Sequence, residues 1–340
     1  MNYQNESIDV VIPWVDGSDI EWKKEYVKYH SLEKPDDNAN SAIRYQDLDI
    51  LKYWFRSVEN NMPWINRIFF ITYGHVPDFL ITDHPKLKVV RHDEYIPKKY
   101  LPIFSANPIE INLHRIKDLS ENFIYFNDDV IPLQPIEEGY YFKNNIVCDE
   151  AVESPIMPVD IGQISAWSCW MKANDILLIN KNFNKREVQK KNSEKWFSKA
   201  YGELLERNER LSYWNNFCGF HDPHMANAFH KSVFEEVWEK ETDVMEKTSQ
   251  SRFRTETDVN QYLIRYWQLC KGDFIPRKTL GKSYLVTGEN YIEVANDIRE
   301  KKYQMVSLNE DCAEDVFKLV KHEISEALEA LFPEKSSYER

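Results

Sequence analysis

The strongest constraint on the fold comes from residues 123–130, which read FIYFNDDV. Four apolar residues, three of them aromatic, are typical of a buried strand. That strand runs directly into Asn127, Asp128 and Asp129, although buried charge is costly unless it is paired or coordinated. Carboxylates at a strand end are well placed to hold a divalent cation against a diphosphate, because hard cations prefer oxygen ligands. The alternative is a strand that simply ends in an Asx turn.

The first half of the chain alternates between strand-like and helix-like segments. This order predicts an α/β fold with a mostly parallel, Rossmann-like sheet flanked by helices. Ligands bind beyond the carboxyl ends of the strands in such sheets. Asp16, Gly74 and Asp128 each follow a predicted strand, so we expect a site at that edge. The apolar patterns predict strands at 8–15, 65–72, 87–91 and 122–126, and helices at 20–30, 47–60 and 107–118.

The second half shows mainly helical patterns. We predict helices at 226–240, 258–270 and 310–331, and hence a mainly helical C-terminal part. Composition changes near 175–185, which suggests an α/β part at 1–180 and a helical part at 181–340 that completes the site. One continuous catalytic domain is the alternative.

Composition excludes several classes of protein. The net charge of −13 disfavours nucleic-acid binding. Five scattered cysteines without a C-x-x-C pair fit free thiols in a reducing compartment rather than a disulfide framework or a zinc site. The polar start lacks the apolar core of a signal peptide, and no apolar run approaches the ~20 residues that span a bilayer. We therefore expect a cytoplasmic protein that is at most peripheral to the inner face of a bacterial membrane.

One basic segment modifies this expectation. Residues 181–199 hold seven Lys or Arg against two Asp or Glu. A solvated helix face is one interpretation. A patch for a phosphorylated or lipid-linked acceptor at a membrane surface is the other.

Two groups of residues in the first half are candidates for phosphate or nucleotide contacts. Gly17 permits close backbone approach and Asp16 has the chemistry to bind a ribose or base edge, although the D-G-S-D run is also an ordinary turn. Arg44, Arg56, Arg91 and Arg115 are cations in an acidic chain. Arg115, shortly before the carboxylates, is the best placed of them to meet a diphosphate; surface ion pairs are the alternative.

Two blocks in the second half carry candidate catalytic groups. His221 and His224 flank Asp222, and either histidine has a general base's chemistry near neutral pH. Zinc ligation lacks a third ligand with matching spacing, and capping plus packing is the plain alternative. Arg254 is suited to stabilise charge on a transferring phosphoryl group. The alternative there is a capping box of Thr255 with Asp258.

With these blocks in view, the chain resembles the Stealth family of sugar-phosphate transferases. The family's four conserved regions are similar, in order, to residues 8–19, 44–130, 221–232 and 252–260. Two departures stand out. Ser105-Ala106-Asn107-Pro108 stands where the family often has an Asn-Ser-His/Asn-Ala run, and we expect Pro108 to reshape a donor- or acceptor-contacting loop. Ile12-Pro13 replaces the more usual Tyr-Thr.

The resemblance implies a glycosyltransferase-like fold and a specific reaction. Members include bacterial capsule polymerases and the lysosomal-enzyme N-acetylglucosamine-1-phosphotransferase. The implied reaction transfers hexose-1-phosphate or N-acetylhexosamine-1-phosphate from a UDP-sugar to a glycan hydroxyl, forms a phosphodiester and releases UMP. The expected acceptor is a lipid-linked intermediate of capsule or cell-surface polysaccharide synthesis.

The resemblance also implies roles for single residues. Asp128 and Asp129 would hold Mg²⁺ or Mn²⁺. The implied donor-binding residues are Asp16, Gly17, Arg44, Arg115 and Asn107. The implied catalytic residues are His224 as general base, His221 as the second choice, Arg254 and Asp129.

Two rival functions remain open on the sequence. A metal-dependent glycosyltransferase would use the same carboxylates, attack the sugar carbon and release UDP. A non-catalytic scaffold of a polysaccharide assembly complex would suit the basic segment and the last helix, but has little reason to keep the acidic, histidine and arginine blocks together.

Overall fold

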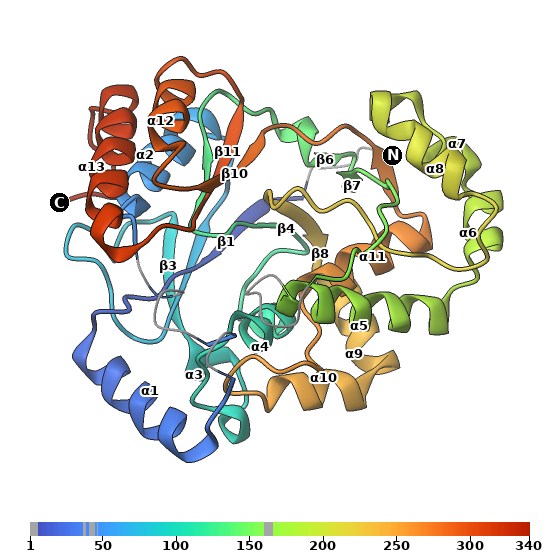
Figure 1. The fold of residues 1–340 in the computed structure, drawn as a ribbon, viewed down its shortest axis with the longest axis horizontal. Coiled ribbons are helices and arrows are strands. Elements are labelled where there is room, and N and C mark those ends of the chain that lie inside the picture. Colours follow the sequence, from blue (N-terminus) through green and yellow to red (C-terminus); the bar gives the residue numbers. More distant parts are fainter. Residues whose placement is uncertain (1–5, 37–38, 41–44, 46, 160–165) are drawn as a thin grey trace.

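The structure is a computed structural model, and it describes residues 6–36, 39–40, 45, 47–159 and 166–340. Its centre is a five-stranded sheet in the order β3-β2-β1-β4-β8 (Figure 1). Four strands are parallel and β8 pairs with β4 in the antiparallel sense. The strands are β1 (Ile8–Pro13), β2 (Ile68–Thr72), β3 (Leu87–Arg91), β4 (Asn122–Tyr125) and β8 (Asn227–His230).

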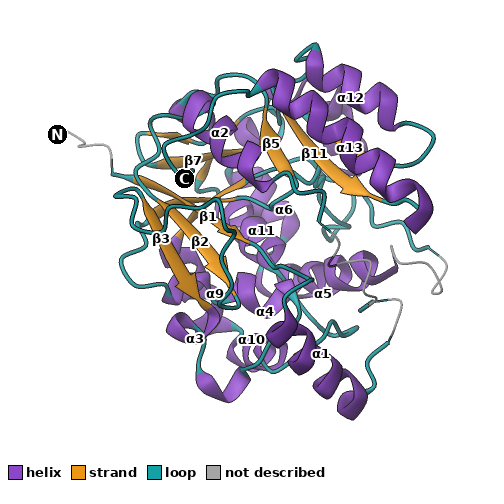
Figure 2. Cartoon of the chain, turned by 90° about the vertical axis from the view of Figure 1, so that its left-hand side faces the viewer, coloured by secondary structure: helices purple, strands orange, loops and turns teal. Residues whose placement is uncertain are grey.

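Helices cover both faces of this sheet (Figure 1 and Figure 2). Neighbouring residues along β1 enter different hydrophobic clusters, because successive side chains of a strand point to opposite faces: Val10 and Ile12 lie in one cluster and Val11 in the other. The first face is covered by α2 (Leu51–Asn61), α12 (Tyr291–Arg299) and α13 (Glu314–Leu331). The second is covered by α4 (Ala106–Ile111), α5 (Ala166–Asn182), α9 (Lys231–Lys240), α10 (Thr242–Ser249) and α11 (Gln261–Lys271).

Two small sheets extend the fold. In one, β10 (Lys282–Val286) pairs with β11 (Met305–Glu310), and β11 pairs with β5 (Val130–Pro132), which follows the acidic pair. Leu308 N donates to Asp129 O at 3.0 Å, so this sheet brings residues near 310 beside the acidic pair. The other contains β6 (Phe142–Lys143), β7 (Ile146–Asp149) and β9 (Phe274–Pro276).

The remaining helices are peripheral or short. They are α1 (Ile20–Glu33), α3 (His92–Tyr95), α6 (Lys185–Lys191), α7 (Ser193–Trp196) and α8 (Leu205–Leu211), with 3-10 turns at Lys98–Tyr100, Leu113–Arg115, Glu138–Tyr140 and Lys199–Leu204. Among the described residues, none of the helices combines the length and apolar character that crossing a bilayer requires.

The predicted α/β fold with a mostly parallel sheet and a helical C-terminal region is confirmed, with corrections to single elements. The predicted helix at 226–240 is wrong at its start, because residues 227–230 form the edge strand β8. The helix predicted at 47–60 begins only at Leu51, since Asp49 has a left-handed φ of 57°. The helix predicted at 107–118 is interrupted at Asn112, which separates α4 from the 3-10 turn Leu113–Arg115. The suggested division after residue 180 falls inside α5, and both hydrophobic clusters combine residues from its two sides.

Candidate active site

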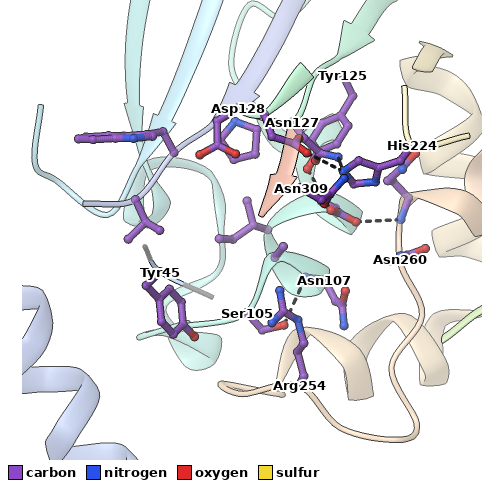
Figure 3. Close-up of a pocket in the computed structure, with 18 of the residues that line it drawn as sticks. Tyr45, Ser105, Asn107, Tyr125, Asn127, Asp128, His224, Arg254, Asn260 and Asn309 are labelled. Carbon is purple, nitrogen blue, oxygen red and sulfur yellow. Dashed lines mark hydrogen bonds and ion pairs between the residues drawn. The ribbon is translucent and has the colours of Figure 1, made fainter. Parts of the chain in front are cut away.

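A pocket of about 590 Å³ opens at the carboxyl ends of the strands. Trp14 and Val15 follow β1, Asn127 to Asp129 follow β4, and Asn309 and Glu310 end β11. The pocket thus lies at the edge of the sheet where the sequence predicts a site. In Figure 3, Asp128 and Asn127 lie on one side of the pocket, and Arg254 with Ser105 lies on the opposite side.

Asp129 is anchored on one carboxylate oxygen and free on the other. Its Oδ2 accepts from Ser307 Oγ at 3.0 Å and lies 3.2 Å from His224 Nε2. Its Oδ1 is buried and has no hydrogen-bond partner among the described residues. A buried carboxylate oxygen without a donor is costly, and a bound cation would satisfy it.

The pocket is crowded with negative charge. Six carboxylates from the described part of the chain line it, against the lysine and arginine side chains of Lys172 and Arg254. The six are Asp47, Glu110, Asp128, Asp129, Asp222 and Glu310. An anionic substrate would be repelled here unless a cation entered with it.

Crowding shifts the proton affinity of the acidic groups. Burial, and then the charges of Asp129, Asp47 and Glu310, raise the pKa of Asp128 well above its usual range. Burial, with Asp129 and Asp47 adding to it, raises the pKa of Glu310 to about 7. Both shifts show that this end of the pocket disfavours further negative charge.

The residues present fit a cation that is shared with substrate. Within the described residues, no three His, Cys, Asp or Glu side chains form a ready metal centre. Mg²⁺ is commonly held by one or two carboxylates with substrate phosphates completing its coordination, which an adjacent aspartate pair can satisfy. Two observations support such a fit. Asp129 Oδ1 is buried without a partner among the described residues, and burial with neighbouring carboxylates raises the pKa of Asp128.

His224 faces the acidic pair. Its Nε2 lies 3.2 Å from both Asp129 Oδ2 and Asn127 Nδ2. Burial acts to lower the pKa of His224, but the charge and hydrogen bond of Asp129 outweigh it, and the pKa is raised overall. His224 also has a left-handed φ of 53°, which is uncommon outside glycine and is held in place by the surrounding structure.

A buried arginine clamp fixes the loop that carries His224. Arg265 is 1% exposed, and its five N–H groups bind Asp149 twice, Asp222 Oδ1 at 2.7 Å, and the carbonyl oxygens of His221 and Glu150. Tyr266 Oη donates to Asp222 Oδ2 at 2.5 Å. The clamp explains how the loop sustains the backbone conformation of His224.

Arg254 lines the pocket and is held in place by residues 39–40. Asn40 Oδ1 accepts from Arg254 N at 2.9 Å, and Arg254 Nη1 donates to Ala39 O at 3.2 Å. Thr255 N and Oγ1 donate to Asp258, which closes the loop that bears Arg254. Thr255 and Asp258 are therefore in contact, as the capping-box alternative expects, but they do not cap a helix, because α11 begins at Gln261 and is capped by Asn260.

Asn107 supports the same loop. It lines the pocket, and its Nδ2 donates to Asp258 Oδ2 at 3.0 Å. Ser105 caps the short helix α4 and also lines the pocket. The structure therefore brings Asn107, Arg254, His224, Asp128 and Asp129 together.

Other predicted site residues lie elsewhere. His221 is outside the pocket lining, with Nδ1 bound to Glu150 Oε1 at 2.6 Å. Arg115 is exposed, donates to Asn112 and stacks 4.4 Å from the Trp238 ring, so it does not reach the pocket. The position of His221 follows from Glu150, a partner distant in the sequence, and that of Arg115 from the 3-10 turn that contains it. The structure therefore does not bring these two residues together with the others.

The D-G-S-D turn also lies beside the pocket rather than in it. Asp16 Oδ1 accepts from Ser18 N and Oγ at 2.7 and 2.6 Å, as in an ordinary Asx turn. Gly17 is required for another reason: a Cβ there would stand 2.2 Å from Tyr45 O. The structure therefore does not place Asp16 and Gly17 in the lining of the pocket, and Arg44 lies outside the described residues.

The remaining cations are used inside the fold. Arg56 binds Glu339 and Glu329, which ties α2 to the C-terminal end, and Arg91 pairs with Asp93. Within the basic segment, Lys185 is fully buried against Glu153, and Lys181 pairs with Glu241. No residue of 181–199 lines the pocket in the described part of the chain.

Several lining residues were missed at the level of sequence. Asn309 and Glu310 end an apolar strand as the acidic pair does, so the same strand-end pattern was available to find them. Asp47 accepts from Trp14 Nε1 at 3.0 Å, a contact between two loops that no local pattern indicates. Glu110 is buried on a short helix and accepts from Tyr125 Oη at 2.9 Å. Lys172 enters from α5, 3.3 Å from Asp222.

The chain matches two conserved regions of one protein family. Residues 6–32 match the model of Stealth protein conserved region 1, and residues 44–150 match that of Stealth protein conserved region 2. The second match includes the acidic pair and Glu110, while His224 and Arg254 lie outside both matches.

Curated relatives span nearly the full chain. A capsular polysaccharide phosphotransferase WcwK of Streptococcus pneumoniae is 39% identical over 98% of both chains. The exopolysaccharide phosphotransferase cps2G of Lactiplantibacillus plantarum is 35% identical over 98% of this chain and 96% of the relative. The receptor polysaccharide phosphotransferase WefC of Streptococcus gordonii is 34% identical over 98% and 99%.

Among solved structures, the glycosyltransferase GlyE of Streptococcus pneumoniae overlaps with 93% of this chain and 78% of its own, at 9% identity and a TM-score of 0.25. That overlap is too low to carry an argument, and the fold assignment rests on the sheet itself.

Proposed function

The chain belongs to the Stealth family, and from this membership and the geometry of the pocket we propose that it transfers a sugar-1-phosphate from a UDP-sugar to a glycan hydroxyl. The products are a phosphodiester and UMP. The names of its relatives support phosphotransfer in the synthesis of capsule or exopolysaccharide.

One observation carries the proposal most directly. An acidic pair with an unpaired, buried oxygen faces a histidine and stands across the pocket from an arginine (Figure 3). Phosphoryl transfer needs positive charge around the transferring group and a base for the attacking hydroxyl, and little other chemistry from the protein.

Asp128 and Asp129 would hold Mg²⁺ or Mn²⁺ in this proposal. When bound, the ion neutralises charge on the oxygens of the diphosphate. Arg254 neutralises a further oxygen of the transferring phosphoryl group from the opposite wall of the pocket.

His224 acts as the general base. It takes the proton of the acceptor hydroxyl, whose oxygen attacks the β-phosphorus in line while UMP departs from the opposite side. Asn127 orients the ring through the contact to Nε2. Because the bond between the sugar C1 and its oxygen is not broken, the product retains the anomeric configuration of the donor.

The decisive experiment identifies the nucleotide product. The purified protein is given Mg²⁺ or Mn²⁺, a panel of UDP-hexoses and UDP-N-acetylhexosamines and a crude bacterial glycan fraction, and the nucleotides are separated by chromatography. UMP is the expected product, and a control with UDP alone detects contaminating phosphatase.

Release of UDP instead of UMP would show attack at the sugar carbon and replace the proposal with a glycosyltransferase. If neither nucleotide is released, calorimetry measures whether the protein binds the same UDP-sugars. A protein that binds none of them in the presence of either ion would be the non-catalytic scaffold.

A further inference from the structure

A second cavity of about 640 Å³ lies next to the active pocket. The two cavities share Arg254 and Trp167, so they meet at these side chains. The second cavity lies between the C-terminal end of α1, the end of α10 and the loop that follows it; α1 and α10 lie on the same side of the molecule in both views (Figure 1 and Figure 2). Its lining is Glu33, Pro35, Asp36, Trp167, Lys247, Gln250, Ser251, Arg252, Phe253, Arg254, Thr255, Glu256 and Thr257.

Specific contacts hold the walls of this second cavity. Arg252 Nη1 pairs with Glu33 Oε1 at 2.6 Å and joins the loop to α1. Asn174 Nδ2 on α5 donates to Glu256 O at 2.8 Å and to Asp258 O at 2.9 Å, which joins the other end of the loop to α5. The cavity is therefore bounded by elements that are tied to one another.

The two cavities differ in charge. Among the described residues, the active pocket is lined by six carboxylates against one lysine and one arginine, whereas the second cavity is lined by three acidic and three basic side chains. A nucleoside diphosphate needs positive charge around it. The acidic pair of the active pocket is suited to bring in a cation, whereas the described lining of the second cavity contains no adjacent pair of carboxylates. Its balanced charges, hydroxyl groups and amide are suited to an uncharged ligand rich in hydroxyl groups.

Arg254, which both cavities share, relates the second cavity to the proposed phosphoryl transfer. Arg254 Nη1 donates to Ala39 O, and the Arg254 side chain lines both cavities. In an in-line transfer the attacking hydroxyl arrives from the side opposite the leaving nucleotide. With the donor diphosphate at the acidic pair, the second cavity supplies such an entry beyond Arg254.

We propose that the second cavity binds the acceptor glycan and leads its attacking hydroxyl past Arg254 and Trp167 to the active pocket. This inference rests on the proposed function. Thr257, which is exposed and lines the cavity, is the position at which a large side chain would obstruct that path.

The test compares Thr257→Trp with the matched control Asn216→Trp, which adds the same side chain at an exposed position outside both cavities. Two quantities are measured for each protein: UMP affinity by calorimetry with Mg²⁺ present, and UMP release with the glycan fraction that serves the wild type. We expect Thr257→Trp to reduce release by about 100-fold, because the acceptor cannot reach its position, and to bind UMP within about 2-fold of the wild type.

A milder variant tests the same cavity in case Thr257→Trp does not fold. Gln250→Ala shortens one lining side chain, and we expect it to raise the KM for the glycan fraction by about 5-fold with little change in kcat. Asn216→Trp should match the wild type in both measurements.

The outcomes separate the two proposals. Normal release by Thr257→Trp and an unchanged KM in Gln250→Ala would overturn the acceptor cavity while leaving the proposed function intact. Weakened UMP binding in Thr257→Trp would assign the second cavity to the donor and likewise overturn the inference. A wild type that binds UMP but releases none from UDP-sugars would instead remove the function on which the inference depends.

Discussion

Two neighbouring acidic clusters of this protein have opposite electrostatics. The balanced cluster consists of Asp149 and Asp222, held by Arg265 through three short contacts. The unbalanced cluster consists of Asp47, Asp128, Asp129 and Glu310, and no lysine or arginine of the described residues forms an ion pair with it. The first cluster stabilises the fold, and the second has no lysine or arginine partner for its negative charge among the described residues.

The arginine near each cluster differs in how many of its N–H groups are bound within the fold. Arg265 and Arg254 both stand near carboxylates, but all five N–H groups of Arg265 are bound and it is 1% exposed. Arg254 is half-buried at two cavities. Fully bound donors stabilise a fold, whereas an arginine that lines a cavity is placed to meet a ligand.

Removal of the arginine from the balanced cluster should give the largest effect. Arg265→Met removes the short ion pairs to Asp149 and Asp222 and leaves only the longer contacts with Arg277 and Lys172. We expect it to lower the free energy of unfolding by about 3–5 kcal/mol, because both carboxylates are buried. Arg254→Met is the matched control, with an expected loss below about 1 kcal/mol, because its side chain is only half-buried. Urea unfolding monitored by tryptophan fluorescence measures both. Equal losses in the two variants would erase the distinction between the clusters.

His224 connects the two clusters, with its loop bound to the balanced one and its ring facing the unbalanced one. We expect His224→Asn to lower kcat by about 10²- to 10⁴-fold, because the base is lost. UMP affinity should stay within about 2-fold, since the acidic pair and Arg254 remain. Steady-state UMP release and calorimetry provide the two values. His221→Asn, whose ring lies outside the pocket, serves as the comparison, and a larger loss of kcat there would reverse the assignment.

Asp128→Asn tests the unbalanced cluster directly. Because burial and three neighbouring carboxylates raise the pKa of Asp128, a neutral amide relieves repulsion. We expect the free energy of unfolding without metal to rise by about 1 kcal/mol. Affinity for Mn²⁺ should fall by about 10-fold or more. Thermal unfolding in EDTA and Mn²⁺ titration followed by electron paramagnetic resonance measure these changes. A destabilised variant with unchanged Mn²⁺ affinity would mean that the cluster does not hold a cation.

Glu110 should give the smallest effect, in the pH dependence of stability. Burial raises its pKa from 4.5 to about 7, despite hydrogen bonds from Gln261 N and Tyr125 Oη. Between about pH 4.5 and 7 the folded state keeps a proton that the unfolded state has released, so the contribution of Glu110 to stability falls as pH rises through this range. We expect Glu110→Gln to remove part of that fall. Urea unfolding at several pH values in EDTA measures the slope, and an identical slope in the variant would contradict the assignment.

Local pattern was sufficient for the main elements of the sheet and for part of the site. The apolar run at 123–126, followed by an amide and two carboxylates, predicts a buried strand that ends in polar groups, and the structure places these groups at the pocket. Both features depend on neighbours in the chain. The same applies to the Arg254 loop, whose closing contact joins Thr255 to Asp258, three residues apart.

The other assignments depended on distant partners. The choice between His221 and His224 follows from Glu150, which binds the first, and Asp129, which binds the second. Arg115 looked suitable beside the acidic pair in sequence, but a 3-10 turn directs it toward Trp238.

The sequence by itself determined the alternation of strands and helices, the acidic strand end and the family to which the chain is similar. Only the tertiary structure decided which charges are balanced. Asp222 is neutralised by Arg265, 43 residues away, and Glu310 reaches the acidic pair because β11 pairs with β5 across the chain. The physical reason is that the proton affinity and reactivity of a charged group depend on burial and on neighbours brought together by non-local packing.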